Sequence, residues 1–173
     1  MIGYIVTLKS DDRWTVYPQL QVENYEIDGC KFKSMLDLVH VDHFNKCITP
    51  YDLKCVWNVE GFYTDYYLYR KAYIQAYLYK QALEYWKTTV GLDDYTVENL
   101  SFIVCDSGGW YTSLIYRLTD EDMLEAYNGF EYKERKYTGV KEGIEDLIWA
   151  KGSNIWNRSK KAYSSNCILN IKG

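Results

Sequence analysis

Several features are scarce in this chain of 173 residues, and each scarcity excludes a class of protein. No apolar run approaches the roughly 20 residues that a helix needs to span a bilayer. The N-terminus has neither a basic leader nor a small-residue cleavage site, which argues against a secretory signal. No repeat, low-complexity tract or Pro/Ser-rich linker interrupts the sequence. We therefore expect one cytoplasmic domain over residues 1–173 that makes no membrane contact and is either the whole protein or a fragment of a longer one.

Cysteines are few and dispersed. The five of them include no close CxxC pair. An odd, scattered set argues against a disulfide framework and against a zinc or iron–sulfur site. We expect reduced thiols, most of them buried.

Positive charge is also in short supply, because the formal net charge is -4. Any contact with nucleic acid must then come from a local basic patch. Arg70 and Lys71, at the start of a predicted helix, are candidates for phosphate contact. A second candidate is a C-terminal region in which basic residues alternate with aromatic ones, although a solvated face is the ordinary explanation for such a region. Its basic residues are Arg135, Lys136, Arg158, Lys160 and Lys161.

Aromatic residues, in contrast, are abundant, with 19 tyrosines and 6 tryptophans. Such side chains combine a large apolar body with a polar tip, which suits partly wet cores and contact surfaces.

The N-terminal part of the chain predicts three consecutive strands, over residues 19–27, 31–41 and 47–57. Asp28-Gly29 is a strong turn signal between the first two. Pro50 lies within the third strand and predicts a bulge or an unpaired edge at that point.

The rest of the chain predicts helices mixed with strands. Apolar residues recur at helical spacing over residues 64–87, with Thr64 or Asp65 as the N-cap. A strand at 100–105 has a hairpin partner within 110–118. A capping box at Thr119 and Asp122 opens a helix that stops near residue 129. A helix over 140–151 and a short strand over 167–171 follow. This order indicates an α+β or mixed α/β domain.

Residues suited to catalysis are concentrated on the second and third predicted strands. Side chains alternate along a strand, so Asp52 and Lys54 point to the same face. If the hairpin is centred between Phe44 and Asn45, residues whose numbers sum to 89 lie opposite one another, as Asp37 and Asp52 do. This arrangement needs an even-numbered loop or a compensating bulge, because a slip of one residue would send Asp37 to the other face.

Convergent aspartates with few softer ligands suit Mg²⁺. This ion usually takes one or two carboxylates together with waters and phosphate oxygens, which matches so sparse a set. Lys54 could orient or deprotonate an attacking water, or stabilise the transition-state oxyanion. The plain alternative is a cross-strand ion pair on a solvated sheet face, because a lone D-x-K is common by chance.

The segment resembles the nuclease core of the PD-(D/E)XK superfamily, in particular its RecB-like and phage exonuclease branch. There, a metal-binding Asp on one strand is followed by a hairpin, by (D/E)-x-K on the next strand, and by a helix carrying Q-x-x-x-Y. Asp37, Asp52-Leu53-Lys54, Gln75 and Tyr79 fill these positions in order. The resemblance covers about residues 31–87 and, more loosely, the strand at 100–105. It implies a restriction-endonuclease-like core, with a central mixed β-sheet flanked by helices.

The resemblance also implies an activity and its residues. It implies a Mg²⁺-dependent deoxyribonuclease, with Mn²⁺ able to substitute, and an exonuclease of phage or bacterial recombination and repair more than an endonuclease. Asp37, Asp52 and the Leu53 carbonyl would hold the metal, Lys54 would handle the water, and Gln75 and Tyr79 would place DNA or brace the site. DNA is the expected partner, in the cytoplasm of a bacterial or phage-infected cell. Because relatives form rings or join helicases, a homo-oligomer or a recombination partner protein is a further expectation. The cysteine cluster of some relatives is absent, so we expect no iron–sulfur cluster.

The chain also departs from that pattern. Relatives often contribute a His or Glu from a helical region before the first Asp. Here Glu23 and Glu26 are candidates, but spacing selects neither. We assign no catalytic role to His40, expected on the face opposite Asp37, or to His43, expected in the turn. Two alternatives stay open: a catalytically inactive nuclease-fold module that binds nucleic acid or protein, and an unrelated α+β interaction module in which Asp52-Leu53-Lys54 is a surface feature.

Overall fold

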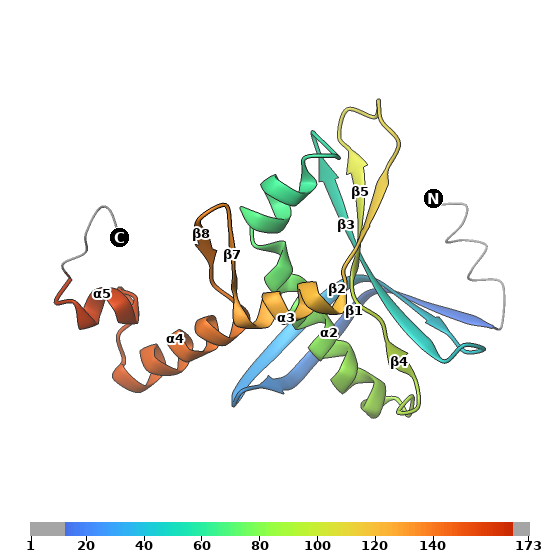
Figure 1. Ribbon diagram of the computed structural model, residues 1–173. Coiled ribbons are helices and arrows are strands. Elements are labelled where there is room, and N and C mark those ends of the chain that lie inside the picture. The colour runs from blue at the N-terminus through green and yellow to red at the C-terminus, as the bar shows by residue number, and fades with distance from the viewer. Residues whose placement is uncertain (1–12, 168–173) are drawn as a thin grey trace.

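A mixed β-sheet with helices packed against it forms the centre of the computed structural model, which describes residues 13–167 (Figure 1). Its strands are β1 (Trp14–Ile27), β2 (Cys30–Asp42), β3 (Cys47–Val56), β4 (Thr96–Val97), β5 (Ser101–Asp106) and β6 (Leu114–Arg117). They lie in the order β1-β2-β3-β5-β6, with β4 also paired to β3. β3 is antiparallel to β2 and parallel to β4 and β5. The predicted mixed α/β fold, with a central mixed sheet flanked by helices, is confirmed.

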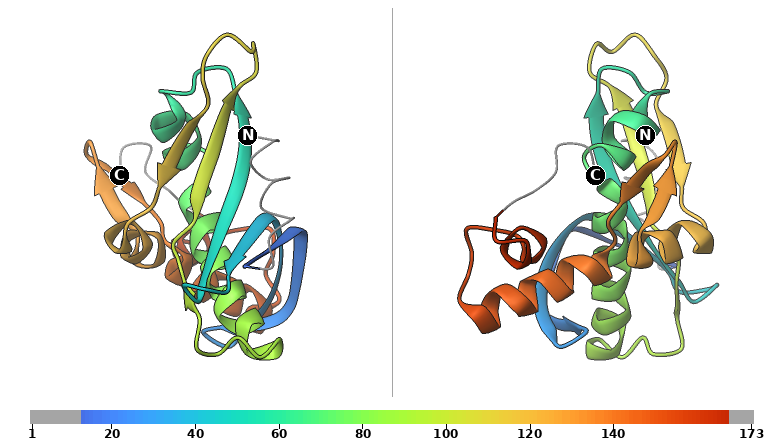
Figure 2. Two further views of the ribbon diagram at one scale, coloured as in Figure 1. Left: turned by 90° about the vertical axis from the view of Figure 1, so that its right-hand side faces the viewer. Right: turned by 60° about the vertical axis from the view of Figure 1, so that its left-hand side comes forward.

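Helices and a small second sheet complete the described chain. They are the π-helical segment η1 (Tyr63–Leu68), α2 (Ala72–Thr89), α3 (Asp120–Asn128), β7 (Phe130–Tyr132), β8 (Arg135–Tyr137), α4 (Val140–Ser153) and α5 (Lys160–Ser164). Only the first turns of α4 join the core, through Val140 and Ile144. The far end of α4 and α5 project away from the sheet (Figures 1 and 2). No helix within residues 13–167 is long and apolar enough to cross a membrane.

The predicted strands at 19–27, 31–41 and 47–57 are present as β1, β2 and β3, and β1 begins earlier than expected. Asp28 and Gly29 form the two-residue turn between β1 and β2, both with positive φ, which is the conformation that this short hairpin needs. Pro50 pairs with Val39 without a register shift. On the other side of β3, pairing stops between Ile48 and Tyr51. Pro50 therefore lies at a gap in the ladder instead of a bulge.

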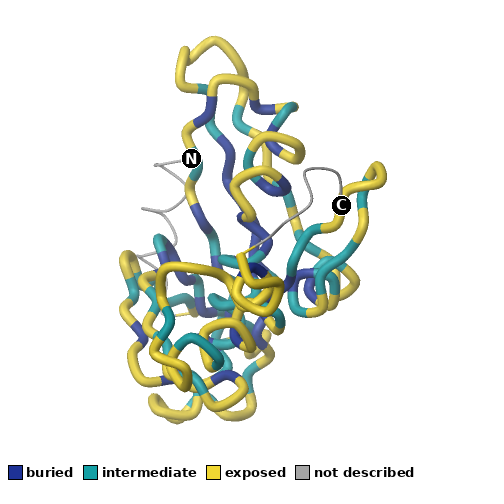
Figure 3. Tube along the Cα trace, turned by 90° about the vertical axis from the view of Figure 1, so that its left-hand side faces the viewer, coloured by how far each residue is buried: buried dark blue, intermediate teal, exposed yellow. Residues whose placement is uncertain are grey.

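Two apolar clusters make up the core, and α2 lies against both. The first joins β1, β2 and the start of β3 to residues such as Leu83 and Trp86 of α2. The second joins β5, η1 and α3 to the start of α2, through residues such as Phe102, Phe62 and Tyr73. Ile74, Tyr77 and Tyr79 of α2 contact both clusters. Figure 3 shows the buried residues gathered along the central strands, with the exposed ones in the loops and at the periphery.

The predicted continuous helix over 64–87 is wrong. The segment divides into η1 and α2, and Lys71 between them has a left-handed φ of 55°. Phe62 and Lys71 occupy the N-cap positions, so neither Thr64 nor Asp65 does. Tyr67 and Leu68 on one side of the break and Tyr73 on the other all pack into the second cluster. Tertiary packing has therefore overridden a local pattern that contains no helix-breaking residue.

Other local predictions have mixed outcomes. The capping box of Thr119 and Asp122 is confirmed at the start of α3, and β5, β6 and α4 are present close to their predicted ranges. β4, β7, β8 and α5 were not expected. Most of the predicted strand over 167–171 lies outside the described residues. The expectation of mostly buried cysteines is wrong, because three of the five are partly exposed and Cys55 and Cys167 are exposed.

Candidate active site where two strands separate

The β2–β3 hairpin has the register that places Asp37 and Asp52 toward one another. Its pairing runs from Asp42↔Cys47 to Leu38↔Tyr51, so the predicted register is confirmed over this stretch. The four-residue turn is organised by the Asp42 carboxylate, which accepts hydrogen bonds from the backbone N–H groups of Phe44 and Asn45, each at 3.0 Å. An even-numbered loop of this kind keeps the alternation of faces in step across the hairpin.

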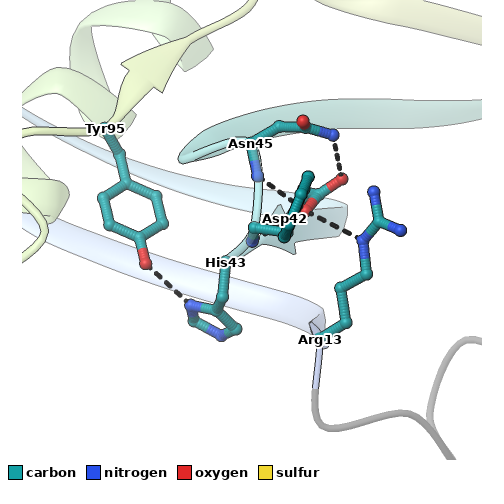
Figure 4. Close-up of polar contacts among 6 residues, drawn as sticks. Arg13, Asp42, His43, Asn45 and Tyr95 are labelled. Atoms are coloured by element: carbon teal, nitrogen blue, oxygen red, sulfur yellow. Dashed lines mark hydrogen bonds and ion pairs between the residues drawn. The ribbon is translucent and has the colours of Figure 1, made fainter.

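Polar side chains surround the turn (Figure 4). Arg13 and the Asn45 side chain also contact the Asp42 carboxylate. Burial alone would raise the pKa of Asp42, but the hydrogen bonds from Asn45, Arg13 and Phe44 outweigh it and lower the pKa to about 2. His43 contacts the Tyr95 hydroxyl at 2.9 Å. Arg13, just before β1, and Tyr95, just before β4, thus contact the hairpin turn from either side of it.

Beyond Leu38 and Tyr51, β2 and β3 separate, and Asp37 lies at the point of separation. Its Oδ2 accepts a hydrogen bond of 2.9 Å from the Leu53 N–H. β2 continues in its pairing with β1, while β3 continues in its pairing with β5. The Leu53 N–H therefore faces the gap between the strands. Because the N–H and C=O of one strand residue point to the same side, the Leu53 carbonyl faces that gap too.

Asp52 and Lys54, on the face of β3 covered by α2, form an ion pair with each other and share a partner in Gln75. The Gln75 amide nitrogen donates to Asp52 Oδ1 at 2.9 Å, and its amide oxygen accepts from Lys54 Nζ at 3.2 Å. Asp52 is 1% exposed, whereas Lys54 is about a quarter exposed. The ammonium of Lys54 therefore lies between a buried carboxylate and solvent.

Tyr79 connects this cluster to β2. Its hydroxyl accepts a 2.7 Å hydrogen bond from the Gln75 amide and donates one of 2.8 Å to the main-chain carbonyl of Met35. Gln75 and Tyr79 lie one turn apart on α2, as i and i+4 positions should. A continuous polar chain thus runs from Met35 on β2, through α2, to Asp52 and Lys54 on β3. It bridges the two strands at the level where their own pairing has ended.

The electrostatics of the cluster are dominated by burial. Desolvation raises the pKa of Asp52 above its usual value, and the negative charge of Asp37 adds to the rise. Lys54 and Gln75 oppose it. Burial likewise raises the pKa of Tyr79, which stays a neutral hydrogen-bonding group. A buried carboxylate with an elevated pKa gains most from a nearby positive charge, because ionisation without one is costly.

The oxygen donors at this gap suit a small, hard cation. Asp37, Asp52 and the Leu53 carbonyl supply two carboxylates and one main-chain oxygen, a set that fits Mg²⁺ with waters and phosphate oxygens filling the other positions. Within residues 13–167, no group of three or more His, Cys, Asp or Glu side chains is arranged to hold a metal. The carboxylate pair is therefore not joined by a third such side chain in the described part of the chain.

Other acidic and imidazole groups considered from the sequence lie elsewhere. Glu23 and Glu26 are exposed on β1, opposite Lys33 and Lys31 of β2. His40 stacks edge-on against Trp14, and burial lowers its pKa. His43 is engaged in the hairpin turn. The structure thus brings Asp37, Asp52, Lys54, Gln75 and Tyr79 together and leaves these four residues out.

Two main-chain groups of the site were missed at the sequence level. The Met35 carbonyl holds the Tyr79 hydroxyl, and the Leu53 N–H holds the Asp37 carboxylate. No side-chain pattern marks such groups.

Comparison with known proteins relates the chain by fold. No family model matches it, and no curated protein matches its sequence. Among solved structures, the crystal structure of a "putative exonuclease" from Eubacterium rectale matches with a TM-score of 0.52 and 15% sequence identity. The match covers 99% of this chain and 61% of the other. At this identity the similarity establishes a shared fold, and this chain spans about three fifths of the length of that protein.

Proposed function

We propose that the chain is a metal-dependent deoxyribonuclease that hydrolyses phosphodiester bonds, acting from DNA ends as an exonuclease of phage or bacterial recombination and repair. One observation carries the proposal. Asp37, Asp52 and Lys54 converge where β2 and β3 separate, and Gln75 contacts both Asp52 and Lys54. These residues also fill the PD-(D/E)XK pattern in order, and the structural neighbour is named as a "putative exonuclease".

Asp37, Asp52 and the Leu53 carbonyl would hold the metal in this proposal. A bound Mg²⁺ lowers the pKa of a coordinated water and neutralises charge on the scissile phosphate. The Leu53 N–H orients the Asp37 carboxylate, and the Gln75 amide orients the Asp52 carboxylate. Such orientation matters because catalytic groups lose effectiveness when their geometry is loose.

Lys54 would act on the attacking water and on the phosphate. Its ammonium is held by Asp52 and Gln75, yet the side chain remains partly exposed to solvent. From there it can orient a water molecule or stabilise the negative charge that develops in the transition state. Gln75 is a positioning residue, because its single amide group holds both the carboxylate and the ammonium, and Tyr79 fixes that amide.

The decisive experiment is cleavage of end-labelled linear DNA and of circular DNA, with Mg²⁺ or Mn²⁺, by the native protein and by Lys54→Ala. We expect loss of linear DNA alone, abolished by the substitution. Lys80→Ala is a matched control, because Lys80 lies on α2 and is part-buried against Asn99. It should cleave as the native protein does.

The other results of this experiment point to other functions. Cutting of the circle would replace the exonuclease by an endonuclease. Native protein that is inert with both metals would overturn the enzymatic proposal, and the chain would then be a nuclease-fold module that binds nucleic acid or protein without cutting.

A further inference from the structure

A groove lined by basic residues adjoins the candidate active site. Its volume is about 480 Å³, and it is bounded by residues of β2 on one side and by the segment that begins α2 on the other. Lys33, Arg70 and Lys71 supply its charged groups, and no acidic side chain lines it. The protein has a formal net charge of -4, so a groove with three cationic side chains and no acidic one is a local positive patch on a negatively charged protein.

The groove is continuous with the site. Gln75 and Tyr79, which hold Asp52 and bridge to β2, also line it, and so does Met35, whose carbonyl accepts from Tyr79. Lys33 lies on β2 four residues before Asp37, on the same strand face by alternation. A ligand that filled the groove would therefore contact Gln75 and Tyr79, the residues that connect the groove to Asp52.

The cations are held in place on the α2 side. The Arg70 guanidinium lies 4.6 Å from the ring centroid of Tyr66, and Lys71 Nζ donates to the Thr138 hydroxyl at 3.2 Å. Glu23, the cross-strand neighbour of Lys33, lines an adjoining hollow that shares Lys33 with this groove. No carboxylate lines the groove itself, and Arg70 and Lys71 lie on its other side. Arginine and lysine arranged this way suit phosphate oxygens.

We propose that this groove binds the backbone phosphates of the DNA strand next to the bond that is cut, with Lys33, Arg70 and Lys71 as the contacting groups. The inference rests on the proposed function, since it assigns to the groove the substrate of the same site. Apolar atoms of Met35, Ile74 and Leu78 complete the lining and would contact sugars. Such a site grips DNA without reading its sequence, because phosphate contacts carry no base information.

The test measures the affinity of the protein for a short fluorescein-labelled DNA oligonucleotide, both single-stranded and as a duplex. Fluorescence anisotropy reports the binding, and EDTA is present so that no cleavage occurs. The groove variant is Lys33→Ala/Arg70→Ala/Lys71→Ala. The control variant is Lys151→Ala/Arg158→Ala/Lys160→Ala, which removes the same three charges from exposed positions near the C-terminus. The control includes part of the basic region that the sequence offered as a rival surface.

We expect the groove variant to bind the oligonucleotide at least about tenfold more weakly than the native protein does. For single-stranded DNA, the slope of log K against log salt concentration should be smaller in magnitude by about 2. The control variant should keep native affinity. Equal losses in both variants would mean bulk electrostatics and would overturn the proposal. Native affinity in the groove variant, or no DNA binding by the native protein, would overturn it as well.

Two further measurements keep the outcome unambiguous. Lys71 has a left-handed φ, so the double variant Lys33→Ala/Arg70→Ala, which leaves it in place, should show most of the loss if the triple variant unfolds. A native affinity in this double variant would count against the groove. Cleavage separates the two proposals: protein that binds through the groove but does not cut would overturn only the nuclease, whereas protein that cuts with or without the groove cations would overturn only the groove.

Discussion

The two halves of the β2–β3 hairpin differ in strand pairing, and the candidate site lies in the half that is not paired. Near the turn, the strands pair from Asp42↔Cys47 to Leu38↔Tyr51, and the residues facing α2, such as Val39 and Ile48, are buried and apolar. Beyond that point the strands part, and Asp37, Asp52 and Lys54 lie at this level of the sheet. Where pairing ends, main-chain groups become available to ligands and polar side chains gain room. The paired half sets the register of the two strands, and the separated half holds the candidate site residues.

This contrast predicts that changes in the separated half will act on activity. Asp37→Asn and Asp52→Asn should each reduce DNA cleavage by at least about 100-fold, because each removes the negative charge of a carboxylate that would hold the metal. The same substitutions should weaken Mg²⁺ binding measured by calorimetry. Asp93→Asn, on an exposed loop, is the matched control. Native cleavage by either site variant would contradict the assignment of that carboxylate.

Changes in the paired half should act on stability instead. Ile48→Ala removes a fully buried side chain and should lower the free energy of unfolding by about 2–5 kcal/mol. Urea denaturation measures the loss, and the specific activity of the folded protein should stay native. Leu53→Ala, at a position about half exposed, should cost less than about 1 kcal/mol. A larger loss of stability in Leu53→Ala than in Ile48→Ala would contradict the prediction that the paired half contributes more to stability.

Lys54→Ala should change how the stability of the protein depends on pH. Burial raises the pKa of Asp52 in the folded protein, so the contribution of this group to stability is greatest when it is protonated and falls as the pH rises through that pKa. Without Lys54 the carboxylate is harder still to ionise, so the loss of stability relative to native should grow with pH. We expect a deficit of about 1–3 kcal/mol at pH 8 and less at pH 4.

Denaturation curves at both pH values check this prediction. Lys80→Ala is the control, since Lys80 bonds an amide and not a carboxylate, and its effect on stability should not depend on pH in this way. A deficit for Lys54→Ala that is constant across the range would show that Asp52 does not depend on Lys54 for its ionisation.

The smallest effect is expected at the turn. Asp42 has a pKa lowered to about 2 in the folded protein, so its contribution is present above the unfolded value near 3.9 and is lost as the pH falls toward 2. Asp42→Ala should lower stability by about 1 kcal/mol at neutral pH and by little at pH 2. Thermal unfolding across this range checks the prediction, with Asp93→Ala, on an exposed loop, as the comparison. An equal deficit at both extremes would show that Asp42 acts through something other than its charge.

Local pattern was a good guide to β1, β2, β3, β5 and α3, because strand alternation, short turns and capping boxes depend on neighbours in sequence. It failed at residues 69–71, where the predicted helix breaks although no Gly or Pro is present. The break depends on how Tyr67, Leu68 and Tyr73 pack, and those contacts join segments that are distant in the chain. β4 and the β7–β8 hairpin are too short for a periodic pattern to reveal.

The sequence by itself identified the residues that carry the candidate chemistry, and strand alternation predicted that Asp37 and Asp52 lie opposite each other if the hairpin turn has an even number of residues. Only the tertiary structure decided that β2 and β3 separate just beyond the paired stretch, that Gln75 and Tyr79 bridge the gap, and that Lys33 joins Arg70 and Lys71 around one groove. The physical reason is that each strand pairs with a different neighbour beyond that point. Such choices depend on packing across the whole domain, which no local stretch of sequence encodes.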